Sequence, residues 1–540
     1  MITIHNLYHT TKYLKINQII NRIKRKITKP KLISCEKIVE SPLAGVWLPV
    51  ELVKSNYIGG AEYRFLNHQV KVTDWNDLRQ EKLWLYNLHY FDDLNAIGRR
   101  DRKEVHRELI ASWIEKNPPL KGNGWEPYPQ SLRIVNWIKW FLSGNQPEAT
   151  WQQSLWQQAA VLEQDLEYHL LGNHLFANAK ALIFAGCYFE GRDATRWLET
   201  GLSILDEELK EQILDDGGNF ELAPMYHNIM LADVLDIINL TAVYQSPELE
   251  KRIIGLRNLA KKMLTWMNVM THPNGDVALF NDSANGIAGT ADKLNDYAFQ
   301  LGVDVKLDDE LVTHLKDSGY VKLMVGQQSA FLDVAKVGPD YIPGHAHADT
   351  LSFEWSYGKQ RVFVNSGTSV YGLGAERLRQ RKTAAHNTVV VDEQDSSEVW
   401  SGFRVARRAY PSIPILNSTG GTLTVECSHN GYMRLVGKVT HSRKWIMSDD
   451  SFLISDKLSG RYLTAKAHYH LHPDIKIKRN DDVIYLVLPC GKLLQLTIEG
   501  ADIEVVDTTW HPEFGLSIAN KKLILSFNQS EVSFNISRVN

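Results

Sequence analysis

The sequence predicts a multidomain α+β protein in which a domain of antiparallel helices precedes an antiparallel β-sandwich. At 540 residues the chain exceeds the size of one ordinary hydrophobic core. Apolar residues recur at helical spacing from about residue 70 to 315, and they alternate with polar residues beyond about residue 320. We therefore expect an N-terminal basic helix and lead-in segment over residues 1–70, a helical domain over 71–318 and a β-sandwich over 319–540.

Six segments of the helical half carry their apolar residues on one face of a helix. Short polar or glycine-containing turns separate them, for example at residues 190–192 and 215–218. Consecutive helices with short connections pack antiparallel, and a sustained series of such pairs can close into a ring. The expected helices span residues 101–114, 151–171, 175–189, 194–214, 225–244 and 248–270.

Alternation of apolar and polar residues marks nine segments of the second half as strands. Turn signals such as Gly420-Gly421 and Asp449-Asp450 lie between them. So many strands without intervening helices predict antiparallel sheets, which we expect to pack as a sandwich. The expected strands span residues 329–337, 351–364, 422–427, 444–455, 465–472, 483–488, 493–498, 503–506 and 523–527.

Composition excludes some classes of function. Lys and Arg (60) nearly balance Asp and Glu (63), and a net charge of −3 argues against a nucleic-acid binder, which carries a basic excess. The chain is rich in Trp (15) and Tyr (21), but aromatic side chains both line carbohydrate sites and fill large cores. No stretch is long and apolar enough to span a bilayer.

The N-terminal segment bears on location. Lys12, Lys15 and Asn17 interrupt the apolar run that a signal peptide needs, so we expect a cytoplasmic protein. Residues 1–30 contain no acid, and isoleucines at helical spacing accompany a cluster of basic residues. This pattern is typical of an interfacial helix and predicts a peripheral membrane contact through residues 12–29, at the inner face of the membrane. The alternative, which we favour at this level, is a surface helix that docks on its own domain.

Histidines gather in two motifs that predicted strands connect. The GHAHAD segment at residues 344–349 and the AHNT segment at residues 385–388 place three imidazoles within about one strand pair. Histidine moves protons near neutral pH and also binds metals. The cluster therefore favours a functional site over a set of structural histidines.

Two segments of the helical half combine polar residues with the start of a helix. In LGNHLFAN, Asn173 and His174 precede an apolar helix, which an ordinary N-cap would also explain. In GNFELAPMYHN, a proline suits the first helical turn, so Tyr226 and His227 lie at a helix N-terminus. The helix dipole there favours anions and helps to stabilise a tyrosinate.

The ordered set of these motifs resembles a known family. Asn-His before one helix, Tyr-His after a glycine-rich turn, GHAHAD, NSGT and AHNT occur in the order found in the heparinase II/III-like polysaccharide lyases, over roughly residues 80–475. The resemblance implies an (α/α) toroid, which is an incomplete helical barrel, followed by an antiparallel β-sandwich, with the active site between them. It also implies β-elimination at a uronic acid of an acidic polysaccharide.

β-Elimination needs three kinds of group. A donor must stabilise the dianion-like intermediate that forms when the C5 proton leaves beside a charged carboxylate. A base must remove that proton, and an acid must protonate the leaving oxygen on C4. The resemblance implies that Asn173 neutralises the carboxylate, with His174 beside it. It further makes Tyr226 the acid and a candidate base, His345 the other proton-transfer or positioning group, and His227 an assisting residue.

The same resemblance implies a divalent metal, usually zinc, held by His347, the residue at position 365 and His386. The chain departs from the pattern because Asn365 stands where an aspartate is common. A neutral amide is a poorer ligand than a carboxylate. Two possibilities follow, an occupied zinc site or a metal-free polar cluster in which Asn365 hydrogen-bonds both histidines.

Further candidates for substrate binding lie around these motifs. Arg377 and Arg381 fall between the two histidine motifs, and arginine forks match carboxylate and sulfate groups. We expect them to contact substrate, the alternative being a solvated loop with paired charges. Trp125 and Tyr128 are aromatic candidates for the sugar site, with helix packing as the equal alternative.

Three functions remain open, and no oligomeric state is predicted. We favour a lyase acting on a uronate-containing polysaccharide, in the making or trimming of a bacterial capsule, O-antigen or exopolysaccharide if the protein is cytoplasmic. A non-catalytic glycan-binding or assembly protein on the same fold is the second. The third is a glycoside hydrolase, whose two carboxylates would come from Glu126, Asp215, Glu221, Asp276 and Asp282.

Overall fold

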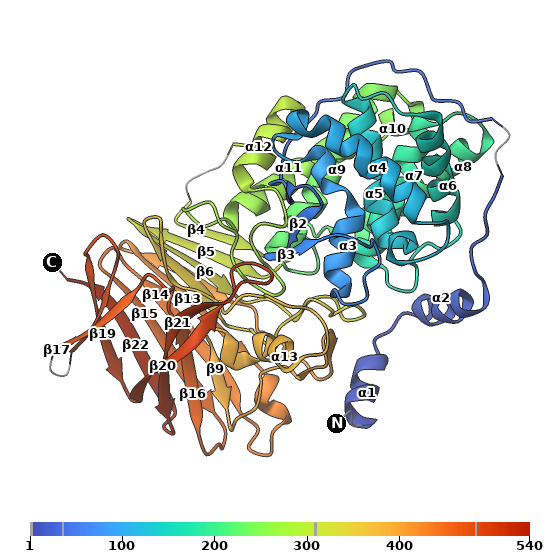
Figure 1. Ribbon diagram of the computed structural model, residues 1–540. Helices are drawn as coiled ribbons and strands as arrows, with labels where there is room; N and C mark the ends of the chain where they lie inside the picture. The colour runs from blue at the N-terminus through green and yellow to red at the C-terminus, as the bar shows by residue number, and fades with distance from the viewer. Residues whose placement is uncertain (1–3, 35–36, 307–309, 481–482, 540) are drawn as a thin grey trace.

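Two bodies of secondary structure follow one another along the chain, a helical one and then a β one (Figure 1). The computed structural model describes residues 4–34, 37–306, 310–480 and 483–539. The last helix of the first body is α12 (Ala291–Gln300), and the first strand of the second is β4 (Val312–Leu315). The junction therefore lies a few residues before the boundary expected from the sequence.

Helices α5 (Pro127–Leu142), α7 (Gly172–Tyr188) and α9 (Pro224–Tyr244) are buried on nearly every side. Thirteen of the sixteen residues of α5 are buried, and this helix was not among those expected from the sequence. The other helices of this body are α3 (Lys82–Tyr90), α4 (Lys103–Lys116), α6 (Ala149–Leu162), α8 (Arg192–Gln212), α10 (Pro247–Glu250) and α11 (Ile253–Val269).

Part of the expected lead-in segment belongs to the helical body. Trp47, Tyr63 and Phe65 are buried in the same hydrophobic core as the helices. Two helices that precede this part, α1 (Ile4–Thr11) and α2 (Ile16–Ile27), lie outside the helical bundle (Figure 1). A small three-stranded sheet precedes α3 along the chain. It consists of β1 (Tyr57–Gly59), β2 (Glu62–Phe65) and β3 (His68–Lys71).

After β4, the β body consists of the following strands and one helix: β5 (Tyr320–Val325), β6 (Gln328–Asp333), β7 (Phe353–Tyr357), β8 (Gln360–Phe363), α13 (Ala375–Arg381), β9 (Val389–Val391), β10 (Val399–Trp400), β11 (Arg404–Val405), β12 (Ile415–Thr419), β13 (Thr422–His429), β14 (Thr440–Met447), β15 (Ser451–Ser459), β16 (Ala465–His470), β17 (Lys476–Asn480), β18 (Val483–Val487), β19 (Leu493–Glu499), β20 (Asp502–Trp510), β21 (Ile518–Phe527) and β22 (Glu531–Arg538).

These strands form a sandwich of antiparallel sheets. An eight-stranded sheet in the order β12-β13-β14-β15-β22-β19-β18-β17 forms one layer. A five-stranded sheet, β4-β5-β6-β7-β8, and a four-stranded sheet, β20-β21-β16-β9, form the other. Aromatic pairs join the layers, since the ring centroids of Phe353 and Phe452 are 5.6 Å apart and those of Tyr469 and Phe534 are 4.3 Å apart.

Several expected elements are divided or shortened in the structure. Residues 351–364, expected as one strand, form the β7–β8 hairpin, and residues 248–270, expected as one helix, form α10 and α11. Residues 444–455, expected as one strand, form the β14–β15 hairpin, because Asp449 and Asp450 make a turn. The helix expected over 151–171 ends at Leu162, and the backbone N–H of Glu167 instead donates to Asn178 Oδ1 of α7 at 2.8 Å. Among the helices of the described residues, none is long and apolar enough to cross a bilayer.

Candidate active site

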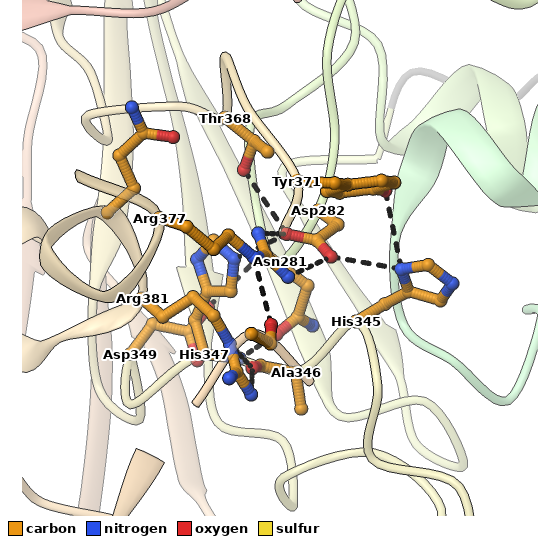
Figure 2. Close-up of polar contacts among 12 residues, drawn as sticks. Asn281, Asp282, His345, Ala346, His347, Asp349, Thr368, Tyr371, Arg377 and Arg381 are labelled. Atoms are coloured by element: carbon orange, nitrogen blue, oxygen red, sulfur yellow. Dashed lines mark hydrogen bonds and ion pairs between the residues drawn. The ribbon is translucent and has the colours of Figure 1, made fainter. Parts of the chain in front are cut away.

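Side chains from both bodies meet at the N-terminal ends of α7 and α9. The Nδ1 atom of His345 lies 2.9 Å from Oδ2 of Asp282 and 3.4 Å from the hydroxyl of Tyr371 (Figure 2). The rings of His345 and Tyr226 are adjacent, with centroids 4.1 Å apart. The structure thus brings together a tyrosine of the helical body and a histidine of the β body that the sequence assigned to one site.

Tyr226 lies in the first turn of α9, which Pro224 begins. Its hydroxyl is 2.8 Å from the hydroxyl of Tyr371. Burial raises the pKa of Tyr226 well above its usual value, and Tyr371 adds to the rise; burial also raises the pKa of Tyr371. The stabilisation of a tyrosinate expected from the helix dipole does not outweigh burial. Both phenols are protonated at neutral pH, which suits Tyr226 to donate a proton.

Asp282 is the central acceptor of this region (Figure 2). It pairs with both terminal nitrogens of Arg377, Nη2 lying 2.6 Å from Oδ2, and His347 Nε2 lies 2.8 Å from Oδ1. Burial alone would raise the Asp282 pKa, but the Arg377 guanidinium and the bonds from His345 and His347 hold it well below its usual range. Because an ionised carboxylate only accepts, His345 carries its proton on Nδ1.

Glu221 faces the other nitrogen of that histidine. Its Oε2 lies 3.4 Å from His345 Nε2, and the backbone N–H of Asn173 also stabilises the carboxylate. Burial raises the pKa of Glu221, although His345 and His174 oppose the rise. Glu221 therefore links His345 of the β body to the start of α7 in the helical body.

His174, in the first turn of α7, is held by a buried carboxylate. Its Nδ1 lies 3.1 Å from Oε1 of Glu167, and its ring packs on Tyr128 with centroids 4.4 Å apart. Burial works against charge on His174, but Glu167 and Glu221 outweigh it and raise the His174 pKa. The imidazolium is therefore favoured, and it supplies a positive charge next to Asn173.

The backbone before Asn173 is packed tightly against the site. Gly172 has φ +58°, and a Cβ there would lie 2.9 Å from Ile342 Cδ1 and 3.3 Å from Glu221 Oε1. Glycine suits this left-handed conformation, and a larger residue would also have to displace the end of the Ile342 side chain. Asn173 itself is half-buried. Its position beside Glu221 and His174 places it with the other candidate residues.

His227 is not brought to this group, contrary to the expectation that it assists. Its Nδ1 accepts the backbone N–H of Asn219 at 3.3 Å, and its Nε2 donates to the carbonyl of Met263 at 2.9 Å. Burial lowers the pKa of His227 to about 4, so the ring is neutral. With both nitrogens used, His227 supports the turn that leads into α9.

Three residues expected to bind substrate are structural. Arg377 is fully buried on Asp282, and Arg381 donates to the carbonyls of Ala346, Ser401 and Arg404. A guanidinium group carries five N–H donors, so one arginine can bind several backbone carbonyls at once. Trp125 lies in the helical core and donates from Nε1 to the carbonyl of Asn117 at 3.1 Å. Tyr128, by contrast, lies next to His174 as described above.

The expected metal residues form a hydrogen-bonded chain. His347 uses Nε2 on Asp282, and its Nδ1 lies 3.2 Å from Nε2 of His386. Asn365 Oδ1 accepts the backbone N–H of Asn387 at 3.3 Å, and its Nδ2 has no partner among the described residues. The expected bonds from Asn365 to both histidines are not formed.

These side chains do not fit a metal ion. His347 and His386 offer one imidazole nitrogen each, but the third residue, Asn365, is a neutral amide whose oxygen already accepts the Asn387 N–H, so the set has no anionic ligand. In the part of the chain that the structure describes, no cluster of three or more His, Cys, Asp or Glu side chains could hold a metal. A zinc ion here stays a prediction from the resemblance, and the donor set argues against it.

Tyr371 and Glu167 complete the site but were not selected from the sequence. Tyr371 follows the NSGT segment by three positions, and this proximity to a motif was its only sequence signal. Glu167 precedes Asn173 by six positions in a segment that the helical pattern included. Glu221 and Asp282 appeared only as possible hydrolase carboxylates.

Family models match both bodies. Residues 10–299 match the model described as "Heparinase II/III N-terminus", and residues 308–537 match "Heparinase II/III-like, C-terminal". The chain belongs to the heparinase II/III family. This confirms the resemblance seen in the motifs.

Members with names include the heparin-sulfate lyase of Pedobacter heparinus, 26% identical over 401 residues, which are 66% of this chain and 60% of that protein. The heparin-sulfate lyase of Bacteroides stercoris is 25% identical over 337 residues, 56% of this chain and 46% of that protein. The chain thus spans less than two thirds of the length of these heparinase II/III relatives.

Solved structures of the family share the fold. The crystal structure of heparinase III superimposes with a TM-score of 0.67 at 20% identity, over 85% of this chain and 76% of that one. A mutant heparan sulfate lyase from Pedobacter heparinus gives a TM-score of 0.59 at 17% identity, over 97% and 88%. The (α/α) toroid followed by an antiparallel β-sandwich is confirmed.

Proposed function

We propose that this heparinase II/III-family protein is a polysaccharide lyase that cleaves a uronate-containing acidic polysaccharide by β-elimination. The observation that carries the proposal is the meeting of a protonated phenol and an oriented imidazole, Tyr226 and His345, from the two bodies. The names of the relatives, heparin-sulfate lyases, support the same reaction class.

The geometry suggests how the roles divide. The Asp282 carboxylate holds the His345 proton on Nδ1, so Nε2 presents a lone pair that can take the C5 proton of the uronate. The electron pair of the C5–H bond forms the C4–C5 double bond, and the C4–O bond breaks. Tyr226, still protonated, gives its proton to the leaving oxygen.

The catalytic groups then have to exchange a proton. After the reaction His345 has gained one proton and Tyr226 has lost one. The Tyr371 hydroxyl lies 2.8 Å from that of Tyr226 and 3.4 Å from His345 Nδ1, so it can pass the Nδ1 proton of His345 to Tyr226. This leaves the new proton on Nε2, and exchange with solvent water returns His345 to the Nδ1–H form before the next turnover. The positive charge of His174, with the Asn173 amide, is suited to balance the substrate carboxylate during proton removal.

The hydrolase alternative finds little support. A hydrolase needs two carboxyl groups that can reach the bond. Asp282 is buried and paired with Arg377, His345 and His347, so it is unavailable to a sugar. The other carboxylate of the group, Glu167, is occupied by His174 and Asn178, so Glu221 has no free carboxylate to act with it.

The test is ultraviolet absorbance during incubation with a panel of uronate polysaccharides, since the C4–C5 double bond of the product absorbs. A rise in absorbance with wild type and none with Tyr226→Phe supports the lyase. New reducing ends without absorbance would instead identify hydrolysis. Unchanged glycan with measurable binding would identify a binding or assembly protein.

We also propose a biosynthetic setting, in which the protein acts at the inner face of the bacterial membrane on a capsule, O-antigen or exopolysaccharide. The support is the basic, acid-free N-terminal segment, whose residues 12–29 provide for a peripheral membrane contact. Cell fractionation tests the location, and recovery of the native protein from the periplasm would contradict it.

A further inference from the structure

Helix α2 docks on the helical body through its polar side. Gln18 is its buried residue, and its Oε1 accepts the backbone N–H of Lys15 at 3.0 Å. Arg25 pairs with Asp165 at 2.8 Å and lies 2.9 Å from His169 Nε2. At about 100° per residue, Gln18 and Arg25 fall on the same side of the helix.

The opposite side of α2 is an isoleucine face that nothing in the described chain covers. Its members are between 45% exposed (Ile19) and 78% exposed (Ile27), and they fall within an arc of about 100°. They are Ile16, Ile19, Ile20, Ile23 and Ile27. The helix does dock on its own domain, which is the interpretation favoured from the sequence, but it docks through its polar side and leaves the isoleucines exposed.

Positive charge surrounds the isoleucine face. By helical spacing Lys24 and Lys26 lie next to it on either side, and both are exposed. Exposed Lys12 and Lys29 extend the charge beyond the two ends of the helix. Residues 4–34 contain no Asp or Glu, so no acidic side chain of this segment balances them.

The segment is held in place without using the isoleucines. Thr10 of α1 accepts a bond from Trp400 Nε1 at 3.1 Å, which ties α1 to the β body. Lys15 pairs with Glu211 of α8 at 2.6 Å, which ties the start of α2 to the helical body. Polar contacts on both sides therefore fix the orientation in which the isoleucine face stays exposed.

We propose that the isoleucine face and its flanking lysines bind the surface of an anionic lipid bilayer. An exposed apolar stripe bordered by lysines matches the interface between acyl chains and acidic headgroups. A second copy of the chain fits less well, since it would set lysines against lysines. This inference deepens the membrane contact proposed above by naming the face that makes it, and it does not depend on the lyase activity.

The experiment is sedimentation of the full-length protein with vesicles of phosphatidylcholine alone and of phosphatidylcholine mixed with phosphatidylglycerol. Wild type is expected to bind the mixed vesicles only, and added salt is expected to weaken the binding. Lys24→Glu with Lys26→Glu should lower the partition constant at least about tenfold, because each basic residue contributes separately. Ile20→Ser with Ile23→Ser should lower it similarly, through loss of apolar burial.

Matched controls are available elsewhere on the chain. Ile254 on α11 is 72% exposed, so Ile254→Ser tests an isoleucine outside the face. Lys261→Glu with Lys457→Glu changes the net charge by the same amount at exposed positions. Both controls should bind like wild type, and all variants should keep the melting temperature and the activity on soluble glycan.

Three outcomes would overturn the proposal. One is a wild type that does not bind mixed vesicles, and another is undiminished binding by the isoleucine variant. The third is a wild type that forms oligomers while the isoleucine variant is monomeric, which would identify the face as a protein interface. A wild type that binds mixed vesicles but cleaves no uronate polysaccharide would count against the lyase proposal alone.

Discussion

The variant Tyr371→Phe tests whether Tyr371 only relays protons to Tyr226 or is itself the proton donor to the leaving oxygen. In Tyr371→Phe, Tyr226 loses a 2.8 Å hydrogen bond and His345 loses a weaker one of 3.4 Å. A hydrogen bond contributes about 0.5–1.5 kcal/mol, so the two together correspond to about 1–2 kcal/mol. At about 1.4 kcal/mol per factor of ten, kcat/KM should fall about 5- to 30-fold. Tyr226→Phe removes the acid itself and should lower kcat by about 10²- to 10⁴-fold.

The assay is the initial rate of absorbance increase from the unsaturated uronate, with substrate affinity measured separately by calorimetry. Both variants should bind the glycan nearly as wild type does. Tyr485→Phe in β18, a half-buried tyrosine of the eight-stranded sheet, is the matched control and should retain full activity. The reasoning would be refuted if Tyr371→Phe were as inactive as Tyr226→Phe, because Tyr371 would then be the donor.

Three further predictions follow from the buried charges. His174 has a raised pKa, so its charge is fully present below its unfolded value of about 6.5 and is lost as pH rises through the folded value; Glu167→Gln should move the alkaline limb of kcat/KM to lower pH. Chelator treatment should leave activity and melting temperature unchanged, whereas Asn365→Asp should acquire zinc by elemental analysis; stoichiometric zinc in wild type would contradict this. Arg377→Met should destabilise the fold by about 3–5 kcal/mol in denaturant unfolding, because it leaves a buried carboxylate without its cation. The control is Arg379→Met, because Arg379 pairs with Glu376 at a more exposed position. This change should lower the free energy of unfolding by less than about 1 kcal/mol.

Much of the fold follows from local sequence patterns. Amphipathic helices such as α8 and alternating strands such as β15 can be predicted because one face is exposed to solvent and the other is buried. Helix α5 was missed, whereas α7 and α9, which are buried to a similar extent, were predicted. The switch from helical to alternating spacing was enough to predict two bodies in the correct order.

The sequence by itself determined which chemical groups are present and the order in which the chain delivers them. Asn173, Tyr226 and His345 could be named because each lies in a short motif. Only the tertiary structure decided which groups face substrate. Arg377 turns inward to Asp282, 95 positions away, and the isoleucines of α2 turn outward. Burial and pairing depend on long-range neighbours, and a side chain's type does not reveal which of them it will meet.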